Sequence, residues 1–429
     1  MMKTKSRAML GLAGCLTAAA LVASGCGSSG GSSTPGLTKT SVLIGSHQPL
    51  TGPAAPGYSE IAPAAKAFFK YVNAGGGVNG RKINLIYKDD GYNPTNTVNV
   101  VKQLVLQNKV FAIWGGLGTP THTKVVDFLN SEKVPDLFVS SGCPCWDDGT
   151  KHPETFGWQP NYTIEGKILG QYLKQKFPGK KVAVFYQDDD FGQGGLAGLK
   201  IELGNQIVAA KPYQPTVTNV APQITAIQKS GAQVLVDFTI PAFTALERLT
   251  SFKLGYKPQL VVSNVGIDPT TVGGLLKSFS KGKAGTALIE GAITDAYLPP
   301  TTDTSNGWIQ LFKKIHDQYD PKAPFDGNVE YGMASAYTFA QALKNAGKNP
   351  TRSSLVDAVE KGGFTGPGLV PFRYSKTEHG GYAGGQIATI KNGQVVTQGQ
   401  ALVTDPGTGP IKVSTMKPAQ PGNNGVVKP

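Results

Sequence analysis

Cysteine is scarce in this chain, which has four cysteines among 429 residues. Cys15 and Cys26 fall within the first 26 residues, so Cys143 and Cys145 are the only two in the remaining sequence. A cysteine zinc site needs a second pair at suitable spacing, and none exists. For Cys143 and Cys145 we expect a tight disulfide in an oxidising compartment, with free or buried thiols as the alternative.

The sequence also lacks the usual signatures of catalysis. It contains no G-x-x-x-x-G-K-[ST] phosphate loop, and no G-x-S-x-G nucleophile turn joins a strand pattern to a helix pattern. Its five histidines are dispersed, and His122 is interpreted as a solvated residue at a helix start, with ligand contact as the alternative. Without a nucleophile–base pair or a metal-binding set, we expect no enzyme, no cofactor and no metal site.

Long apolar runs and clustered arginines are missing as well. After residue 25 no apolar run approaches the length of a bilayer span. The net charge of +13 falls to +10 without the three basic residues near the N-terminus, and the remaining lysines are scattered. This pattern predicts a solvated basic exterior and no nucleic-acid partner.

The first 26 residues carry an export signal. Lys3, Lys5 and Arg7 precede an apolar run, Met9 to Ala23, and then Ser-Gly-Cys. A basic head, a short apolar stretch and small residues before a cut point indicate a signal peptide of residues 1–25. Cleavage before Cys26 would expose a thiol for lipid attachment, although Ala23 stands where leucine is commoner. An ordinary cleaved signal with a free cysteine is the alternative.

Two terminal segments are rich in glycine and poor in apolar residues. Residues 26–40 are expected to form a flexible, lipid-anchored linker, and residues 405–429 a disordered tail. The roughly 365 residues between them exceed one ordinary core and therefore favour two lobes.

Within this region, strand and helix patterns alternate. Strand patterns occupy residues 41–46, 82–87, 111–114, 182–186, around 207, and 234–238. Apolar residues recur at helical spacing in residues 59–72, 97–107, 121–129, 164–173, 196–203 and 221–230. Repeated βα units predict an α/β protein with two doubly wound, Rossmann-like lobes. Ligands of such folds bind beyond the carboxyl ends of the strands.

Several motifs resemble the branched-chain amino-acid-binding (Leu/Ile/Val-type) proteins of ABC transporters. They are Asn73-Ala-Gly-Gly-Gly-Val-Asn-Gly-Arg-Lys-Ile, Tyr87-Lys-Asp-Asp-Gly-Tyr-Asn-Pro, Gln48-Pro-Leu-Thr-Gly-Pro and Asp189-Asp-Phe-Gly-Gln-Gly. The similarity runs in order over residues 41–402. Asp89 and Asp90 end a strand, where we expect them to bond backbone amides and fix loops rather than touch ligand.

The resemblance implies a type I periplasmic-binding (Venus-flytrap) fold, in which two lobes joined by three hinge crossovers close over a solute. We place the crossovers near residues 158–161, 290–293 and 361–364. The first lobe then comprises residues 41–158 and 292–361, and the second comprises residues 159–291 and 362–404. The implied function is a monomeric solute-binding lipoprotein on the outer face of the cell membrane, serving ABC permease subunits. A sensor domain signalling through a membrane receptor is the alternative.

The resemblance also transfers ligand-binding roles to individual positions. The hydroxyls and amides that hold the ligand's carboxylate in the family fall here on Thr119, Ser140, Ser141 and Gly142. Backbone amides and hydroxyls converging on an anion need no full counter-charge.

From the second lobe, Phe191 stands where the family has an aromatic cap over the ligand, and Ile240 is also assigned to the site. Asn264 replaces the family's ammonium-binding glutamate and cannot supply its charge. The expected solute is a small carboxylate or another neutral or anionic molecule, or an amino-acid-like solute where another acid replaces that charge. If the loops differ, Asp237 or one of Asp188 to Asp190 would supply the missing charge. Tyr58 and Trp146 are expected to line the pocket, with partly buried loop aromatics as the alternative.

Overall fold

The computed structural model describes residues 34–422 and 425–427, which belong to one compact unit. The predicted signal peptide, Cys26 and the first part of the predicted linker lie outside the described residues. The rest of that linker is folded rather than flexible. Leu37 bridges Val42, and the Leu43 amide donates to the Gly36 carbonyl at 2.7 Å.

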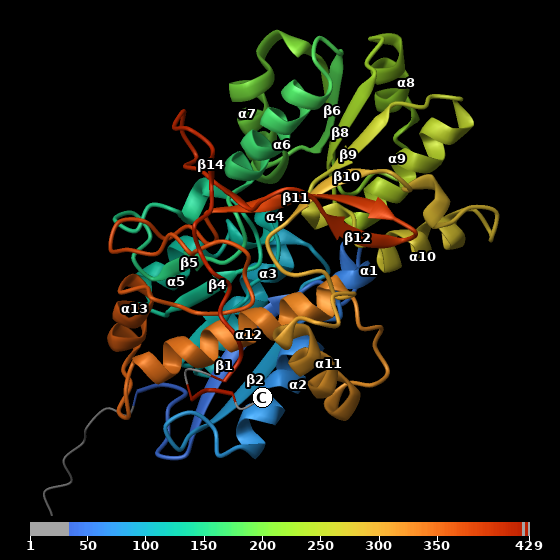
Figure 1. Cartoon of the computed structure of the whole chain (residues 1–429). Coiled ribbons are helices and arrows are strands. Elements are labelled where there is room, and N and C mark those ends of the chain that lie inside the picture. The colour runs from blue at the N-terminus through green and yellow to red at the C-terminus, as the bar shows by residue number, and fades with distance from the viewer. Residues whose placement is uncertain (1–33, 423–424, 428–429) are drawn as a thin grey trace, which may run out of the picture. The chain divides into compact units, whose positions relative to one another are not determined.

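The first lobe is built on a five-stranded parallel sheet with strand order β2-β1-β3-β4-β5 (Figure 1). Its strands are β1 (Ser41–Gln48), β2 (Lys82–Asp89), β3 (Ala112–Trp114), β4 (Asp136–Val139) and β5 (Thr155–Gly157). Its connecting helices are α1 (Ala55–Tyr58), α2 (Ile61–Ala74), α3 (Pro94–Lys102), α4 (Thr119–His122) and α5 (Val126–Ser131). A π-turn, η1 (Gln103–Gln107), extends α3, and a 3-10 turn, η2 (Pro144–Trp146), follows β4.

Helix α2 shows why the sequence folds this way. Its predicted apolar stripe is buried, and the rings of Phe68 and Phe69 make edge contacts with other core aromatics. The helix ends at a glycine-rich turn in which Gly77 has φ 75°. A Cβ there would lie 2.1 Å from the Arg81 carbonyl oxygen, so only glycine fits this turn into β2.

The second lobe carries a nine-stranded sheet in the order β14-β13-β11-β10-β9-β8-β6-β7, with β12 beside β11. Strands β6 to β10 are parallel, whereas β11 to β14 add antiparallel pairs. The strands are β6 (Val182–Gln187), β7 (Ile207–Tyr213), β8 (Val234–Phe238), β9 (Gln259–Val262), β10 (Ile293–Ala296), β11 (Gly384–Lys391), β12 (Gln394–Thr397), β13 (Leu402–Val403) and β14 (Lys412–Val413). The helices are α6 (Tyr162–Lys176), α7 (Asp190–Leu203), α8 (Ala221–Lys229), α9 (Pro241–Lys253) and α10 (Pro269–Phe279), with 3-10 turns η3 (Gly204–Gln206), η4 (Asn264–Gly266) and η5 (Thr286–Leu288). The parallel β/α order predicted for both lobes is confirmed.

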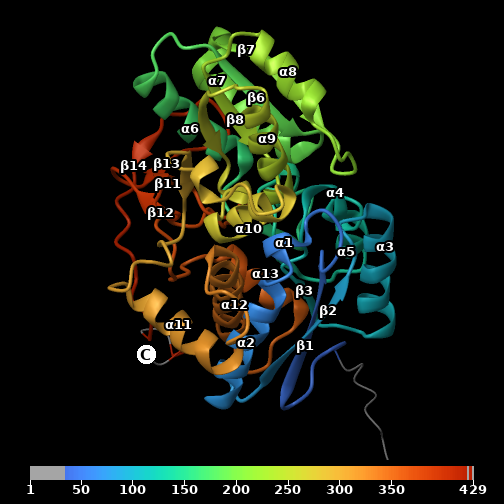
Figure 2. The ribbon, with the colours of Figure 1, turned by 90° about the vertical axis from the view of Figure 1, so that its right-hand side faces the viewer.

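After β10 the chain returns to the first lobe. Helices α11 (Gly307–Tyr319) and α12 (Gly327–Asn345) pack on α2, and α13 (Arg352–Glu360) packs on α12 (Figure 2). Strand β10 pairs with β9 and β11, so residues 293–296 belong to the second sheet. The chain therefore leaves that sheet after Ala296, later than the crossover predicted near 290–293.

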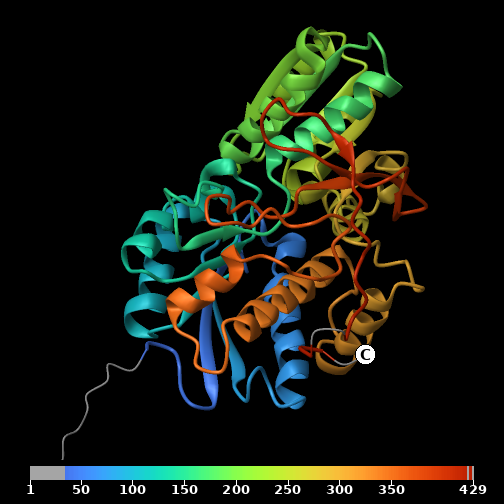
Figure 3. The ribbon, with the colours of Figure 1, turned by 60° about the vertical axis from the view of Figure 1, so that its left-hand side comes forward.

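The described part of the expected C-terminal tail is packed rather than disordered. Lys167 Nζ donates to the carbonyls of Asp405 and Gly409, each at 2.9 Å. Further along, Trp308 Nε1 donates to the Ala419 carbonyl at 2.7 Å. The segment thus runs from the second lobe back to the first (Figure 3). Glycine-rich composition hides these contacts, because they join residues far apart in the sequence.

Candidate ligand-binding site

A cavity of about 380 Å³ lies between the two lobes. It is lined by segments that follow β2, β3, β4 and β5 in the first lobe and β6, β8, β9 and β10 in the second. It therefore sits beyond the carboxyl ends of both sheets, where the doubly wound fold predicts a ligand. Its volume falls within the range of small-molecule pockets.

Six of the sequence-predicted residues line this cavity. They are Tyr58, Thr119, Ser140, Phe191, Ile240 and Asn264. Phe191 is placed by the N-cap of α7, where its amide donates to Asp189 Oδ1 at 3.0 Å, and its ring lies 4.5 Å from that of Tyr162. The fold thus brings together predicted residues from six separate loops.

Three other predicted residues do not line the cavity. Ser141 lies behind Thr119, with its Oγ 2.6 Å from Thr119 Oγ1. A Cβ on Gly142 would lie 2.2 Å from the Pro160 carbonyl, so this residue faces the backbone before α6. Trp146 is buried with its ring edge-on to His122. The hydroxyls of Thr119 and Ser141, both assigned to the ligand's carboxylate, therefore contact each other.

None of the aspartates suggested as substitutes for the missing glutamate lines the cavity either. Asp237 is buried on β8 near Glu247, and burial raises its pKa well above the usual value. The segment from Asp188 to Asp190 holds the start of α7 through the Asp189 cap.

Asn264 joins two buried carboxyl groups. Its Nδ2 donates to Glu165 Oε1 at 2.9 Å and to Asp295 Oδ2 at 3.1 Å. Burial and the neighbouring Asp295 raise the pKa of Glu165 well above its usual range, and burial raises the pKa of Asp295. Burial and mutual repulsion therefore disfavour two negative charges on this pair beside the cavity.

Asp268 and Asp326, the N-cap residues of α10 and α12, both line the cavity. Asp268 Oδ2 accepts from the Gly327 amide at 3.1 Å, which links the two lobes. Asp326 Oδ1 accepts from the Asn328 and Val329 amides. Burial and the charge of Asp268 raise the pKa of Asp326 to about 7.

Replacing Asp326 with asparagine is expected to stabilise the protein above pH 7. Because the folded-state pKa is raised, stability is full below the unfolded-state value near 4 and is lost as the pH rises through about 7. Asparagine keeps the cap but carries no charge. The gain in unfolding free energy should grow from almost none near pH 4 to at most about 4 kcal/mol at pH 8.

Urea unfolding of both proteins across this pH range measures the difference. The exposed Asp357→Asn change serves as the control and should show no such trend. A gain that is equal at pH 4 and pH 8 would contradict the assigned repulsion.

Glu330 is a further acid in the cavity wall, on α12. The residue is only 3% exposed, and among the described residues its Oε1 has no hydrogen-bond partner. Burial alone raises its pKa well above the usual value. In an empty cavity burial therefore favours the protonated form of this carboxyl.

Hydrogen bonds between the lobes flank the cavity. The Tyr58 hydroxyl donates to the Val265 carbonyl at 2.6 Å, and Gln187 Nε2 donates to the Tyr92 hydroxyl at 3.0 Å. These bonds join loops of both sheets and hold the lobes together around the cavity.

Below the loops of the first lobe runs a buried chain of two carboxyls and two imidazoles. Asp90 Oδ2 lies 2.8 Å from His47 Nδ1, His47 Nε2 lies 3.0 Å from His122 Nδ1, and His122 Nε2 lies 2.7 Å from Asp136 Oδ2. Burial lowers the pKa of His47, and the hydrogen bond to Asp90 opposes this shift. His122 is thus neither solvated nor in the cavity wall, unlike both expectations.

The predicted structural roles of the strand-end aspartates are confirmed. Asp89 Oδ1 accepts from the amides of Leu50, Thr51 and Gly91, and Asp90 Oδ1 accepts from the Tyr92 amide. These bonds fix the loops from which Tyr58 and Tyr92 reach the cavity.

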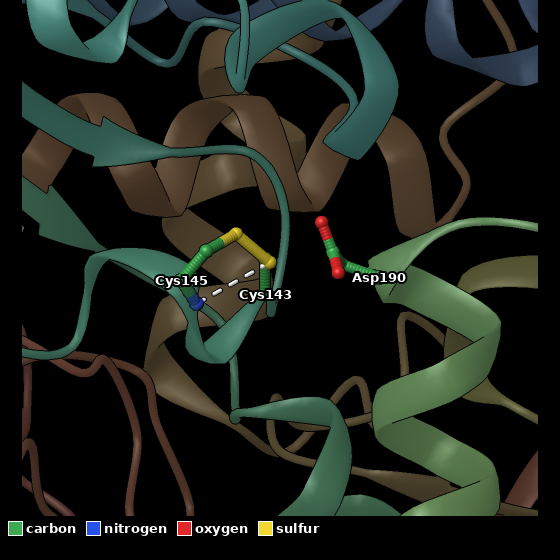
Figure 4. A group of neighbouring side chains, drawn as sticks. All are labelled: Cys143, Cys145 and Asp190. Carbon is green, nitrogen blue, oxygen red and sulfur yellow. Dashed lines mark hydrogen bonds between the residues drawn. A yellow bond between two sulfur atoms is a disulfide. The ribbon is translucent and has the colours of Figure 1, made fainter.

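Cys143 and Cys145 are joined in a disulfide in the loop after β4 (Figure 4). The Cys145 amide donates to Cys143 Sγ at 3.3 Å, and the Asp190 carboxylate of α7 points toward the bridge. Disulfide sulfurs are not the thiolates that bind metal ions, so this group has a structural role. It stiffens a loop that packs on the second lobe near Gly194.

The acidic residues Glu165, Asp268, Asp295, Asp326 and Glu330 were missed by sequence reasoning. Two of these acids stand in a recognisable N-cap pattern. Asp268 precedes Pro269 and Asp326 precedes Gly327, each at a helix start. Glu330 is the only acid within α12, which is otherwise rich in small and apolar residues. An isolated acid on such a helix is a signal for a buried functional group.

A family model described as "Periplasmic binding protein" matches residues 41–394. The chain belongs to the periplasmic binding protein family. Leu/Ile/Val-binding protein homolog 1 of Brucella suis biovar 1 is 24% identical to this binding protein over 370 residues, covering 80% of this chain and 92% of the relative. The suspected family is thereby confirmed.

Solved structures show the same fold. A fatty acid ABC transporter substrate-binding protein from Thermomonospora curvata superposes on the binding protein with a TM-score of 0.74, at 24% identity, covering 87% of this chain and 95% of that one. A branched-chain amino acid ABC transporter protein from Thermus thermophilus with bound valine gives a TM-score of 0.75, at 18% identity, covering 86% and 98%. The type I periplasmic-binding fold is confirmed.

The family identity also confirms that this periplasmic binding protein is not an enzyme, and it implies a location outside the cytoplasm. Within residues 34–422 and 425–427, no helix combines the length and apolar character that a membrane crossing requires.

Proposed function

We propose that this binding protein captures a small, amino-acid-like solute in the cavity between its lobes and delivers it to an ABC permease. The observation that carries the proposal is the cavity itself, which is enclosed by loops of both sheets and lined by polar and aromatic side chains. Relatives named for Leu, Ile and Val binding support an amino-acid-like solute.

Of the solute classes expected from the sequence, the cavity favours the one with an amino group. Acidic side chains line it, and no basic residue from the described part of the chain does so. A simple carboxylate would meet carboxyl groups without a counter-charge. The assigned ligand contacts are Tyr58, Thr119, Ser140, Phe191, Ile240 and Asn264, each of which faces the cavity.

We further propose that the mature protein begins at Cys26 and is tied to the outer face of the membrane by lipid. The basic head, the apolar run and the Ser-Gly-Cys sequence support this assignment. A lipid tether keeps the binding protein near its permease without restricting the two lobes.

Capture from a mixture tests the proposed function even while the solute is unidentified. The purified protein is stripped of bound molecules by unfolding and dialysis, refolded, and incubated with a small-molecule extract of culture medium. Native mass spectrometry should then show one added small molecule per chain. No added mass after incubation with extracts from several media would contradict solute capture.

A further inference from the structure

The cavity wall has an unusual charge balance for a site expected to hold a carboxylate. Its titratable side chains include the acids Asp268, Asp295, Asp326 and Glu330, and among the described residues it has no lysine, arginine or histidine. The hydroxyls assigned to an anion are engaged with each other, since Thr119 Oγ1 lies 2.6 Å from Ser141 Oγ. The wall thus has several acidic side chains and no basic counter-charge for a bound anion.

Glu330 marks the place in the wall where a positive charge on a ligand would lie. Glu330 is 3% exposed, lines the cavity, and has an Oε1 without a partner among the residues described. A buried carboxyl oxygen without a partner is costly and needs an explanation. A donor carried by a ligand would satisfy it.

Aromatic rings complete the wall around this acid. Tyr331 follows Glu330 on α12, and Tyr58, Tyr297 and Phe325 line the same cavity. Aromatic faces attract cations and also pack against hydrocarbon, so together they suit an alkyl chain or ring that carries a positive charge.

We propose that the cavity binds an organic cation, a protonated amine or quaternary ammonium compound, with Glu330 as its anionic partner and with no requirement for a carboxylate on the ligand. This inference rests on the proposed solute-binding function and narrows its substrate class. Burial favours the protonated form of Glu330 in the empty cavity, and a cation beside it favours the ionised form, so a proton passes to solvent when the cation enters. The pair is then buried as neighbouring opposite charges.

Amines and carboxylates with similar carbon skeletons test whether the ligand is an organic cation. Thermal unfolding is followed with 3-methylbutylamine, hexylamine, 1,4-diaminobutane and choline, and with 4-methylpentanoate, hexanoate and succinate. Binding to the folded state raises the melting temperature. A rise with at least one amine and with none of the carboxylates supports the proposal. A rise with carboxylates alone overturns it while leaving solute capture intact, and no rise with any amine also overturns it. The native mass spectrometry experiment with small-molecule extracts tests the proposed solute-binding function separately.

Glu330→Gln tests the assigned partner. Because glutamine resembles the neutral carboxyl, the empty variant should melt like the wild type, but it should bind the stabilising amine at least tenfold more weakly by titration calorimetry. Glu132→Gln, at an exposed acid after α5, is the matched control and should bind normally. Unchanged affinity in Glu330→Gln would overturn the role of Glu330.

Proton release in the wild type gives an independent readout. Calorimetry at pH 7 in two buffers of different ionisation enthalpy should show about one proton released per amine bound. Asp268, Asp326, the Glu165–Asp295 pair, Tyr331 and Tyr382 are the other titratable groups around this site. The release should be lost in Glu330→Gln and kept in the exposed control Glu132→Gln. Release of the same size in Glu330→Gln would assign the proton elsewhere and contradict the proposal.

Discussion

Gly198→Ala is expected to destabilise the protein by roughly 3 kcal/mol, the upper end of the cost of overpacking. Gly198 lies on α7 where that helix meets α6, and a Cβ there would lie 2.2 Å from the Thr163 carbonyl oxygen and 2.8 Å from the Lys167 amide. Both contacts are with backbone, so no side-chain rotation relieves them. The two helices must move apart, which displaces Glu165 from Asn264 and weakens the site as well.

Gly274→Ala is the matched control for this change. Gly274 lies within α10 and is exposed, and a Cβ added there would have no neighbouring atom within 4 Å. Alanine is the better helix former by up to about 1 kcal/mol, so this variant should be slightly more stable than the wild type. Denaturant unfolding of both variants measures the contrast. Equal stability of Gly198→Ala and the wild type would contradict the close helix contact.

Cys26→Ser is expected to move nearly all of the protein from the membrane fraction to the soluble fraction. A serine hydroxyl cannot form the thioether that attaches the lipid, and without acyl chains buried in the bilayer little holds the folded domain to a membrane. Fractionation of cells by centrifugation, followed by immunoblotting, measures the distribution.

The double change Cys143→Ser and Cys145→Ser serves as its control. It removes the disulfide of the folded lobe but leaves the proposed lipid site, so this protein should stay with the membranes. A Cys26→Ser protein that still sediments with membranes would contradict lipid attachment at this residue.

The spacing of apolar residues along the sequence was enough to predict most of the fold. The apolar stripe of α2 and the apolar runs of β1, β6 and β8 depend on neighbouring residues, and the sequence shows those directly. Helix α7 begins at Asp190, six residues before the predicted start at Leu196. Gly195 and Gly198 are needed in this helix for close contact with Phe238 and α6. Tertiary packing overrode the low helix propensity of glycine.

The site was predictable only where a motif resembled the family. Thr119, Ser140 and Phe191 were found in this way, and each lines the cavity. The acids Glu165 and Asp295 were not found, because they lie on α6 and β10 and meet at Asn264 only when the second lobe is folded. The same holds for His47 and His122, which no sequence spacing brings together. Such pairs are a property of the fold and leave no local pattern.

A solute held in the cavity between the lobes should be excluded when a bulky side chain fills that cavity. Native mass spectrometry of Ala296→Trp beside the wild type measures this, since Ala296 lines the cavity at the end of β10 and an indole there would occupy the ligand's space. Ser278→Trp, on an exposed position of α10, is the control. We predict a captured small molecule on the wild type and on Ser278→Trp, and none on Ala296→Trp. The same captured mass on folded Ala296→Trp would contradict the account.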